Sequence, residues 1–202
     1  MHNDLPLIVG IGGTMRPGST SEMALAAALE MARGMGARTK MLAGPALVMD
    51  TYEPGVVARS ANASELIAAL READGVLIAS PSYHGSVSGL LKNAIDYVED
   101  MRYDSRPYFD GRAVGCIVCA DGAQALGSTL FSLRSIIHAL RGWPTPYAAA
   151  LNSLTRPFGQ DGKVKEQEVE RQLRTVVGQV VEFAHTARSA CNGDASLKMG
   201  AH

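Results

Sequence analysis

Short apolar runs that alternate with stretches of helical periodicity constrain the fold of this chain more than any other feature. Residues 7–11, 75–80 and 113–119 are almost wholly apolar. Continuous apolar runs of this length are typical of strands that helices bury on both faces of a parallel sheet. Weaker strands are predicted around residues 40–42 and at residues 146–151. We therefore predict an α/β fold, a doubly wound five-stranded parallel sheet with strand order 2-1-3-4-5.

Helices are predicted between these strands. The first follows Ser19, which with Glu22 forms a capping box. Further helices are expected at residues 64–73, 88–98, 127–140 and 166–188. Residues 43–60 are rich in glycine and proline, so an irregular loop over an edge of the fold is expected there. The pattern predicts a single domain over residues 1–190 and a disordered tail over residues 191–202.

The composition argues against several classes of partner. The chain has 202 residues, with 19 Lys and Arg against 20 Asp and Glu, and its basic residues are scattered. A nucleic-acid partner bound through bulk charge is therefore not expected. Residues 1–6 lack the basic and apolar segments of a signal peptide, and no apolar run reaches the length of a membrane span. We expect a cytoplasmic protein with no membrane partner.

Cys116 and Cys119 have the spacing of a redox or metal pair, but they lie inside an apolar run. Side chains three residues apart on a strand point to opposite faces, so we predict that both thiols pack in the core. No second cysteine pair or histidine cluster completes a metal site, and none is expected. Cys191 is expected to be a free thiol in a reducing compartment.

Two polar loops follow the first and third predicted strands. The first, residues 12–21, places Arg16 among hydroxyl residues just before a helix, so guanidinium, hydroxyl and backbone donors are available for a phosphate monoester. The second, residues 81–86, contains Tyr83 and offers a flat, partly aromatic rim. Both loops leave the sheet where the strand order reverses. The sequence therefore predicts a phosphate-bearing, ring-containing cofactor held at both ends.

Other motifs fit these loops less well. The glycine spacing that ends at Gly18 matches a nucleotide triphosphatase loop, but the lysine that should follow is missing. The dinucleotide fingerprint fails because Met15 stands at its third glycine position. The sequence around Ser88 lacks the spacing of a hydrolase nucleophile, and His84 lies too close to Ser86 in the chain to make a persuasive triad.

The two loops also carry a family resemblance. Residues 14–19 and 80–97 resemble the NADPH-dependent FMN reductase family of flavodoxin-like proteins, and the resemblance extends over residues 7–151. It implies a noncovalently bound FMN that NADPH or NADH reduces and that free flavin, quinone or another small acceptor reoxidises. It also implies a homodimer or homotetramer, with a flavin-dependent monooxygenase as a candidate partner.

The resemblance assigns cofactor contacts to three segments. It places the FMN phosphate on Thr14, Arg16, Ser19, Thr20 and Ser21. It places the isoalloxazine ring and the ribityl chain beside Pro81, Ser82, Tyr83, His84, Gly85 and Ser86, and the flavin also beside Asp121 and Gly122. No catalytic side chain is expected, because the flavin itself accepts the hydride. The helix after the second loop lacks the inserted tyrosine of reductases that bind FMN transiently, so a retained FMN is expected.

Several alternatives remain open at this point. A quinone, azo or metal-ion reductase would use the same FMN site. A flavodoxin-type one-electron carrier would resemble strongly acidic docking proteins, and a net charge of −1 argues against it. A phosphate-ligand binding module without redox activity is a third candidate. Lys92 and Asp96 are spaced either for an ion pair on a helix surface or for a subunit contact.

Overall fold

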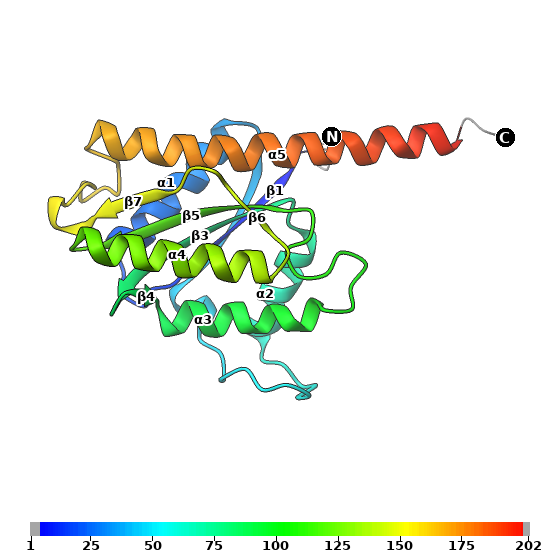
Figure 1. Ribbon diagram of the computed structural model, residues 1–202, viewed down its shortest axis with the longest axis horizontal. Helices are drawn as coiled ribbons and strands as arrows, with labels where there is room; N and C mark the ends of the chain where they lie inside the picture. The colour runs from blue at the N-terminus through cyan, green and yellow to red at the C-terminus, as the bar shows by residue number, and fades with distance from the viewer. Residues whose placement is uncertain (1–4, 200–202) are drawn as a thin grey trace.

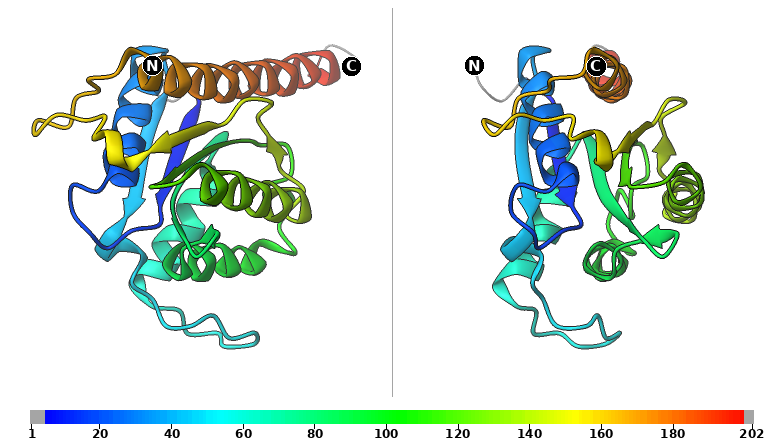
Figure 2. Two further views of the ribbon diagram at one scale, coloured as in Figure 1. Left: turned by 60° about the vertical axis from the view of Figure 1, so that its left-hand side comes forward. Right: turned by 90° about the vertical axis from the view of Figure 1, so that its left-hand side faces the viewer.

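The structure, a computed structural model, describes residues 5–199. A mainly parallel sheet lies between two layers of helices, α1 and α5 on one face and α2, α3 and α4 on the other (Figures 1 and 2). The strands are β1 Leu7–Gly12, β2 Arg38–Ala43, β3 Gly75–Tyr83, β4 Ser86–Val87, β5 Ala113–Ala120, β6 Trp143–Pro144 and β7 Ala149–Asn152. The α-helices are α1 Thr20–Gly34, α2 Ala61–Glu72, α3 Gly89–Asp96, α4 Ala123–Ala139 and α5 Gln167–Met199. The 3-10 helices are η2 Gly44–Leu47, η3 Tyr97–Met101 and η4 Ser153–Thr155.

The sheet confirms the predicted α/β class and corrects its strand count. Its order is β2-β1-β3-β5-β6, with β7 also parallel to β5 and β4 antiparallel to β3. The first four strands of this order, β2, β1, β3 and β5, follow one another in the predicted order. Seven strands are present in the described residues where five parallel strands were predicted, so the predicted order 2-1-3-4-5 is not matched in full.

A tight hairpin accounts for one of the extra strands. His84 and Gly85 both have positive φ, 53° and 81°, as a two-residue type I′ turn requires. The turn reverses the chain at once, and Ser86 pairs with Tyr83. The segment that the sequence placed in a loop therefore adds β4 to the edge of the site.

The other extra strand, β6, precedes the predicted strand at residues 146–151, and only β7 overlaps that range, so two short pieces stand beside β5. Pro144 and Pro146 have no N–H to donate to a neighbouring strand. Side chains bind the backbone between the two pieces instead: Arg134 Nη2 donates to the carbonyls of Thr145 (2.8 Å) and Pro146 (2.9 Å). Gln179 Oε1 accepts from the Tyr147 amide at 3.1 Å. The ladder therefore resumes only at β7.

The sheet separates two apolar cores, and the two cysteines of β5 lie in different ones. Cys116 packs with α2, α3 and α4, whereas Cys119 packs with α1 and α5. Burial raises the pKa of each thiol to about 12. The prediction that both thiols pack in the core on opposite faces is confirmed. The side chain of Cys191 lies outside the described residues.

The segment after β2 begins as η2 and then projects from the body as an irregular loop (Figures 1 and 2). Arg59 fixes its base: Nε and Nη2 donate to Asp100 at 2.8 Å each, and the guanidinium lies 4.8 Å from the Tyr52 ring centroid and 5.1 Å from that of Tyr97. The Tyr52 amide donates to Asn93 Oδ1 at 2.8 Å. The loop is therefore tied to α3 and η3 at its base.

The helix ends differ from the predicted ones by a few residues, and most at the carboxyl terminus. α5 continues to Met199, past the expected end at residue 188. The single domain over residues 1–190 and the tail over residues 191–202 stay predictions. Within residues 5–199 no helix combines the length and the apolar character needed to cross a bilayer. In the same part of the chain no three His, Cys, Asp or Glu side chains are grouped to bind a metal ion.

Candidate functional site

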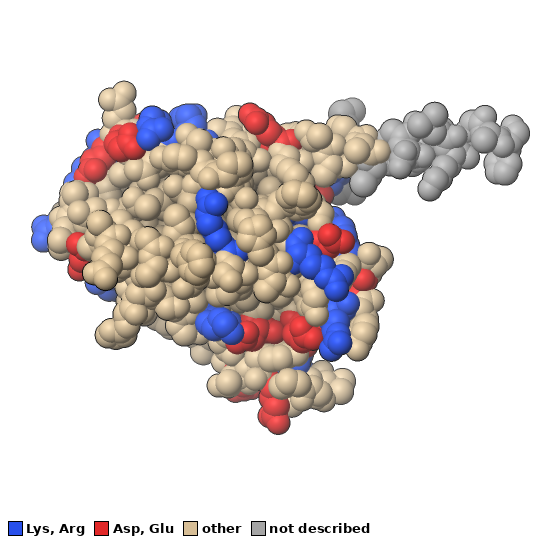
Figure 3. Space-filling model, in the orientation of Figure 1, with Lys and Arg blue, Asp and Glu red and all other residues tan. Residues whose placement is uncertain are grey.

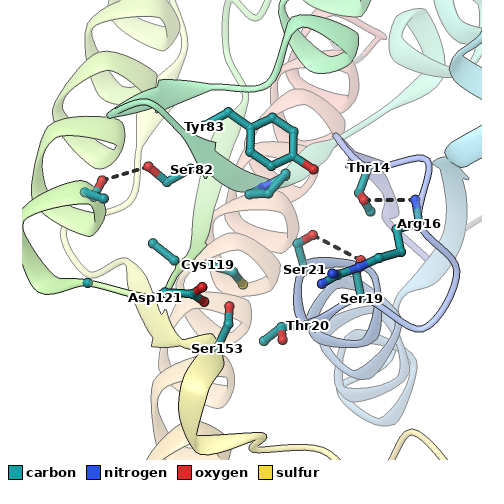
Figure 4. A pocket seen from close by; sticks show the side chains of 14 residues that line it. Thr14, Arg16, Ser19, Thr20, Ser21, Ser82, Tyr83, Cys119, Asp121 and Ser153 are labelled. Carbon is teal, nitrogen blue, oxygen red and sulfur yellow. Dashed lines mark hydrogen bonds between the residues drawn. The ribbon is translucent and has the colours of Figure 1, made fainter.

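A cavity of about 380 Å³ opens at the carboxyl edge of the sheet, where β1, β3 and β5 end (Figure 4). Its size falls in the range of small-molecule sites. Its walls come from the loop before α1, the end of β3, the connection between β5 and α4, and η4. The lining residues are Thr14, Arg16, Ser19, Thr20, Ser21, Pro81, Ser82, Tyr83, Cys119, Ala120, Asp121, Gly122, Ala125 and Ser153.

The amino end of α1 supplies polar donors to one wall. Ser19 is the N-cap and accepts from the Glu22 amide at 3.3 Å, while Glu22 Oε2 accepts from the Gly18 amide at 2.6 Å. Ser19 caps the helix as predicted, but Glu22 binds the Gly18 amide and not the Ser19 amide of a capping box, because the Ser19 amide donates to the Arg16 carbonyl. The amides of Thr20 and Ser21 stand at the first two helical positions, where no helix carbonyl is available to them. The positive end of the helix and these free amides therefore face the cavity.

Arg16 stands in the loop before that helix with its charge unused by the fold. Its amide donates to Thr14 Oγ1 at 3.1 Å, which fixes the backbone of the loop. Its guanidinium is exposed, and among the described residues no side chain or carbonyl pairs with it. Ser19 Oγ and Ser21 Oγ lie 3.4 Å apart beside it (Figure 4). An anion in the cavity would therefore meet a free guanidinium and several hydroxyls.

Buried hydroxyls hold the two predicted loops together. Ser88 Oγ donates to the Gly13 carbonyl at 2.6 Å, and the Ser88 amide donates to Ser80 Oγ at 3.1 Å. The Gly13 amide donates to the Ala79 carbonyl at 2.8 Å. Since Ser80 and Ser88 are almost fully buried, these bonds are shielded from water. The first loop therefore keeps a fixed position relative to the end of β3.

A second hydroxyl pair fixes the opposite wall. Ser82 Oγ lies 2.6 Å from Thr129 Oγ1 and donates to the Ala125 carbonyl at 3.1 Å, which ties the end of β3 to the first turns of α4. The Tyr83 ring stands beside this wall, with 54% of the residue exposed (Figure 4). The cavity thus combines a rigid polar wall with an accessible aromatic ring.

The structure brings most of the predicted site residues together. The cavity is lined by all five residues assigned to the phosphate, by Pro81, Ser82 and Tyr83, and by both Asp121 and Gly122. His84, Gly85 and Ser86 do not line it, because the type I′ turn carries them away from the end of β3. Their contact with the flavin stays a prediction.

Sequence reasoning missed four lining residues, which are Cys119, Ala120, Ala125 and Ser153. Ala125 was missed because α4 begins at Ala123 and not at residue 127. Ser153 was missed because the fifth strand was expected to end at residue 151, with no element after it. Ala120 directly precedes Asp121, so its place beside the predicted loop was a usable signal.

Solved structures share this fold. FerB, a flavoenzyme NAD(P)H:(acceptor) oxidoreductase from Paracoccus denitrificans, matches with a TM-score of 0.72 at 19% identity, over 91% of this chain and 99% of that one. An NADH:FMN oxidoreductase, EMOB, matches with a TM-score of 0.65 at 20% identity, over 90% of this chain and 89% of that one. A flavodoxin, WrbA-like protein from Agrobacterium tumefaciens matches with a TM-score of 0.61 at 16% identity, over 91% and 99%. These likenesses support the predicted flavodoxin-like fold.

Sequence comparison gives the family. An FMN-dependent NADPH-azoreductase of Staphylococcus aureus is 31% identical over 117 residues, which are 57% of this chain and 58% of the relative. The chain therefore spans less than two thirds of the length of that relative. The model of a family described as NADPH-dependent FMN reductase matches residues 6–155, and the resemblance inferred from the two loops is confirmed. The protein belongs to the NADPH-dependent FMN reductase family.

Proposed function

We propose that the protein is an FMN-dependent NAD(P)H oxidoreductase that passes reducing equivalents from a nicotinamide to free flavin or another small acceptor. The observation that carries this proposal is the cavity itself. It joins unpaired phosphate-binding donors and an accessible aromatic ring at the point where the strand order reverses. Family membership supports the same activity.

The donors at one end of the cavity fit the phosphate of FMN. A phosphate monoester carries close to two negative charges and needs donors around its oxygens. Arg16 would pair with this charge, and the amides of Thr20 and Ser21 with the hydroxyls of Thr14 and Ser19 would complete its shell. A flavin without the phosphate would leave these donors bonded only to water. The donor set therefore suits FMN better than riboflavin.

The other end suits a flat ring with a polar edge. Pro81, Ala120 and Ala125 give apolar surface, and Tyr83 lies at the open side. When bound, FMN would accept a hydride from the nicotinamide and pass the electron pair to an acceptor. The chain itself would hold and orient: the Ser82–Thr129 pair fixes one wall, and the Ser88–Gly13 bond fixes the phosphate loop against it. We assign no acid or base role to a side chain.

The acceptor class follows less directly from the site. The name of the azoreductase relative indicates azo compounds as acceptors, and the name of FerB leaves its acceptor unspecified. A quinone or azo reductase with the same FMN site is therefore the second candidate function. A flavodoxin-type carrier is disfavoured by the net charge of −1.

We also propose that the protein is a homo-oligomer that uses the outer face of α4. Figure 3 shows a broad, mostly uncharged surface over this helix. Phe131, midway along α4, is 77% exposed. Lys92 and Asp96 form an exposed ion pair at 2.6 Å on neighbouring α3. A Phe131→Glu variant should shift the mass measured by light scattering to that of a smaller species. A monooxygenase partner and a cytoplasmic location stay predictions.

The test of the proposed function is an anaerobic titration of the FMN-loaded protein. NADPH and NADH are added separately while the flavin absorbance is followed, and free FMN or a quinone is then added. Bleaching by two electrons, followed by rapid recovery of absorbance, is the expected result. A bound flavin that neither nucleotide bleaches would contradict hydride transfer and favour a carrier or a binding module.

A further inference from the structure

One carboxylate in the cavity makes no hydrogen bond or ion pair with the described residues. Asp121 is the first residue after β5, it is exposed, and it lines the cavity. Among the described residues no donor or cation pairs with its carboxylate. Figure 4 shows the carboxylate on the wall near Thr20 and Ser153. The charge is thus turned toward whatever enters the cavity.

No capping bond joins this carboxylate to the helix that follows. The N-cap of α4 is Gly122, and no side chain caps the helix. The first turn of α4 contains no acidic residue. Asp121 stands one position before the cap, so an uncharged residue there would leave the backbone of β5 and α4 with all its hydrogen bonds. The charge gains only a weak interaction with the positive end of α4, and no hydrogen bond of the fold requires a carboxylate here.

The charges of the cavity lie on separate walls. Of the residues that line it, Arg16 and Asp121 carry charge at neutral pH, the first before α1 and the second after β5. Arg16 is assigned to the FMN phosphate in the proposed function. Asp121 is then the charge that a second ligand would meet.

We propose that Asp121 selects acceptors by charge and favours uncharged or cationic acceptors over anionic ones. This inference rests on the proposed function, since it concerns the acceptor of the same site. An anion that enters a partly enclosed cavity experiences the repulsion of a fixed carboxylate through a medium less polarisable than water. The repulsion acts on the acceptor whether or not it touches Asp121, and dissolved salt weakens it.

The test uses two quinones that differ by one charge, 1,4-naphthoquinone and 1,4-naphthoquinone-2-sulfonate, with NADPH and the FMN-loaded protein. The quantity measured is the ratio of kcat/KM for the uncharged quinone to that for the sulfonate. Asp121→Asn should lower this ratio about fivefold to tenfold at low ionic strength. The change should shrink when the ionic strength is raised to about 0.5 M, because the screening length is then only a few ångströms. Asp121→Glu keeps the charge and should keep the wild-type ratio.

A matched control lies at the other end of the same strand. Asp110 is also an exposed aspartate, but it precedes β5 whereas Asp121 follows it. A strand of this length separates the two carboxylates by about 25 Å, which exceeds the screening length at about 0.1 M salt. Asp110→Asn should therefore leave the ratio within about twofold of wild type.

A binding measurement separates this inference from the proposed function. The dissociation constant of the sulfonated quinone is measured on the oxidised protein, where no turnover occurs, and Asp121→Asn should lower it by a similar factor. Turnover of both quinones with a ratio that Asp121→Asn leaves unchanged overturns the role of Asp121 and leaves the oxidoreductase intact. If no acceptor turns over, the proposed function fails, and an unchanged dissociation constant then overturns the charge selection as well.

Discussion

Two arginines at opposite edges of the sheet use their donors in opposite ways. Arg112, before β5, is fully buried, and its guanidinium donates to the carbonyls of Arg71, Ala73, Tyr108 and Asp110 at 3.0–3.2 Å. Arg16, beyond β1, is exposed, and its guanidinium has no partner among the described residues. The fold consumes the donors of one arginine and leaves those of the other free. A free guanidinium beside a cavity therefore marks a place for a ligand.

The helix ends at the two edges show the same contrast. At the amino edge, Arg112 Nε and Arg106 Nη2 both donate to the Ala73 carbonyl, at 3.0 and 2.6 Å, where α2 ends. Cations are favoured at the negative end of a helix, so this end is satisfied within the chain. At the carboxyl edge, the first amides of α1 face the cavity. We call the amino edge the closed edge, because side chains of the chain itself bind the helix end there. We call the carboxyl edge the open edge, because its helix amides can bind an anion in the cavity.

The largest expected effect tests the closed edge. Arg112→Met would remove a donor from four buried or half-buried carbonyls, of which, among the described residues, only that of Ala73 keeps a second donor, Arg106. We therefore expect the free energy of unfolding to fall by about 3–5 kcal/mol. Urea unfolding followed by circular dichroism measures it. The affinity of the folded variant for FMN should stay within about twofold of wild type. A loss below about 1 kcal/mol would show that water replaces the guanidinium at little cost.

The second prediction tests the open edge. Arg16→Met should raise the dissociation constant of FMN about 30- to 100-fold, since one charged donor to an anion contributes about 2–3 kcal/mol. The free energy of unfolding of the FMN-free protein should change by no more than about 0.5 kcal/mol, because no contact within the fold is lost. Fluorescence quenching of added FMN measures the affinity. An unchanged affinity would show that the FMN phosphate does not bind to Arg16.

The third prediction compares the effect of pH on two buried thiols, Cys116 in the middle of β5 and Cys119 near its end in the cavity wall. Burial raises the pKa of Cys116 and Cys119 from 9.0 to about 12. The folded chain then holds protons that the unfolded chain loses above pH 9, so stability should fall between pH 9 and pH 12, by about 1.4 kcal/mol per pH unit for each thiol. Cys116→Ala and Cys119→Ala should each reduce this slope equally in urea unfolding at pH 9–10.5. An unchanged slope in Cys119→Ala alone would show that water in the cavity reaches that thiol.

The open edge could be predicted from the sequence better than the rest, and the reason is local. The cap at Ser19, the unpaired Arg16 and the hydroxyls around it depend on neighbours within a few residues, which the sequence displays. The segment between β6 and β7 is bound by Arg134 and Gln179, which reach it from α4 and α5. Such tertiary contacts leave no periodic signal. Ser153 of the cavity was lost to prediction for the same reason.

The closed edge was not predictable at all, because its key contacts join distant segments. Arg112 reads as a charged residue before an apolar strand, a position where exposure is the usual outcome. Only the fold brings the end of α2 within reach of its guanidinium. The hairpin at β4 was not predicted either: residues 81–86 were expected to form a loop, and the positive φ of His84 and the pairing of Tyr83 with Ser86 required the structure.

The smallest expected effect compares strained residues at the two edges. His84 lies in the hairpin beside the cavity with φ 53°, and Arg141 lies just past the end of α4 with φ 61°. A left-handed backbone conformation destabilises a residue that has a side chain by about 1–2 kcal/mol. Glycine removes this cost, but it also raises the conformational entropy of the unfolded chain, which cancels part of the gain in stability. His84→Gly and Arg141→Gly should therefore each raise the free energy of unfolding by about 0.5–1 kcal/mol.

The two glycine variants should differ in FMN binding even though they agree in stability. Arg141 donates its amide to the His138 carbonyl, and its guanidinium lies over the Tyr108 ring, far along α4 from the cavity. Arg141→Gly should leave FMN affinity unchanged. His84→Gly should weaken it about threefold, or about 0.6 kcal/mol, if the imidazole meets the flavin as the family resemblance implies. Equal affinities in both variants would mean that His84 contributes only to the turn. Positive φ at the open edge would then reflect chain reversal alone, as it does at Arg141.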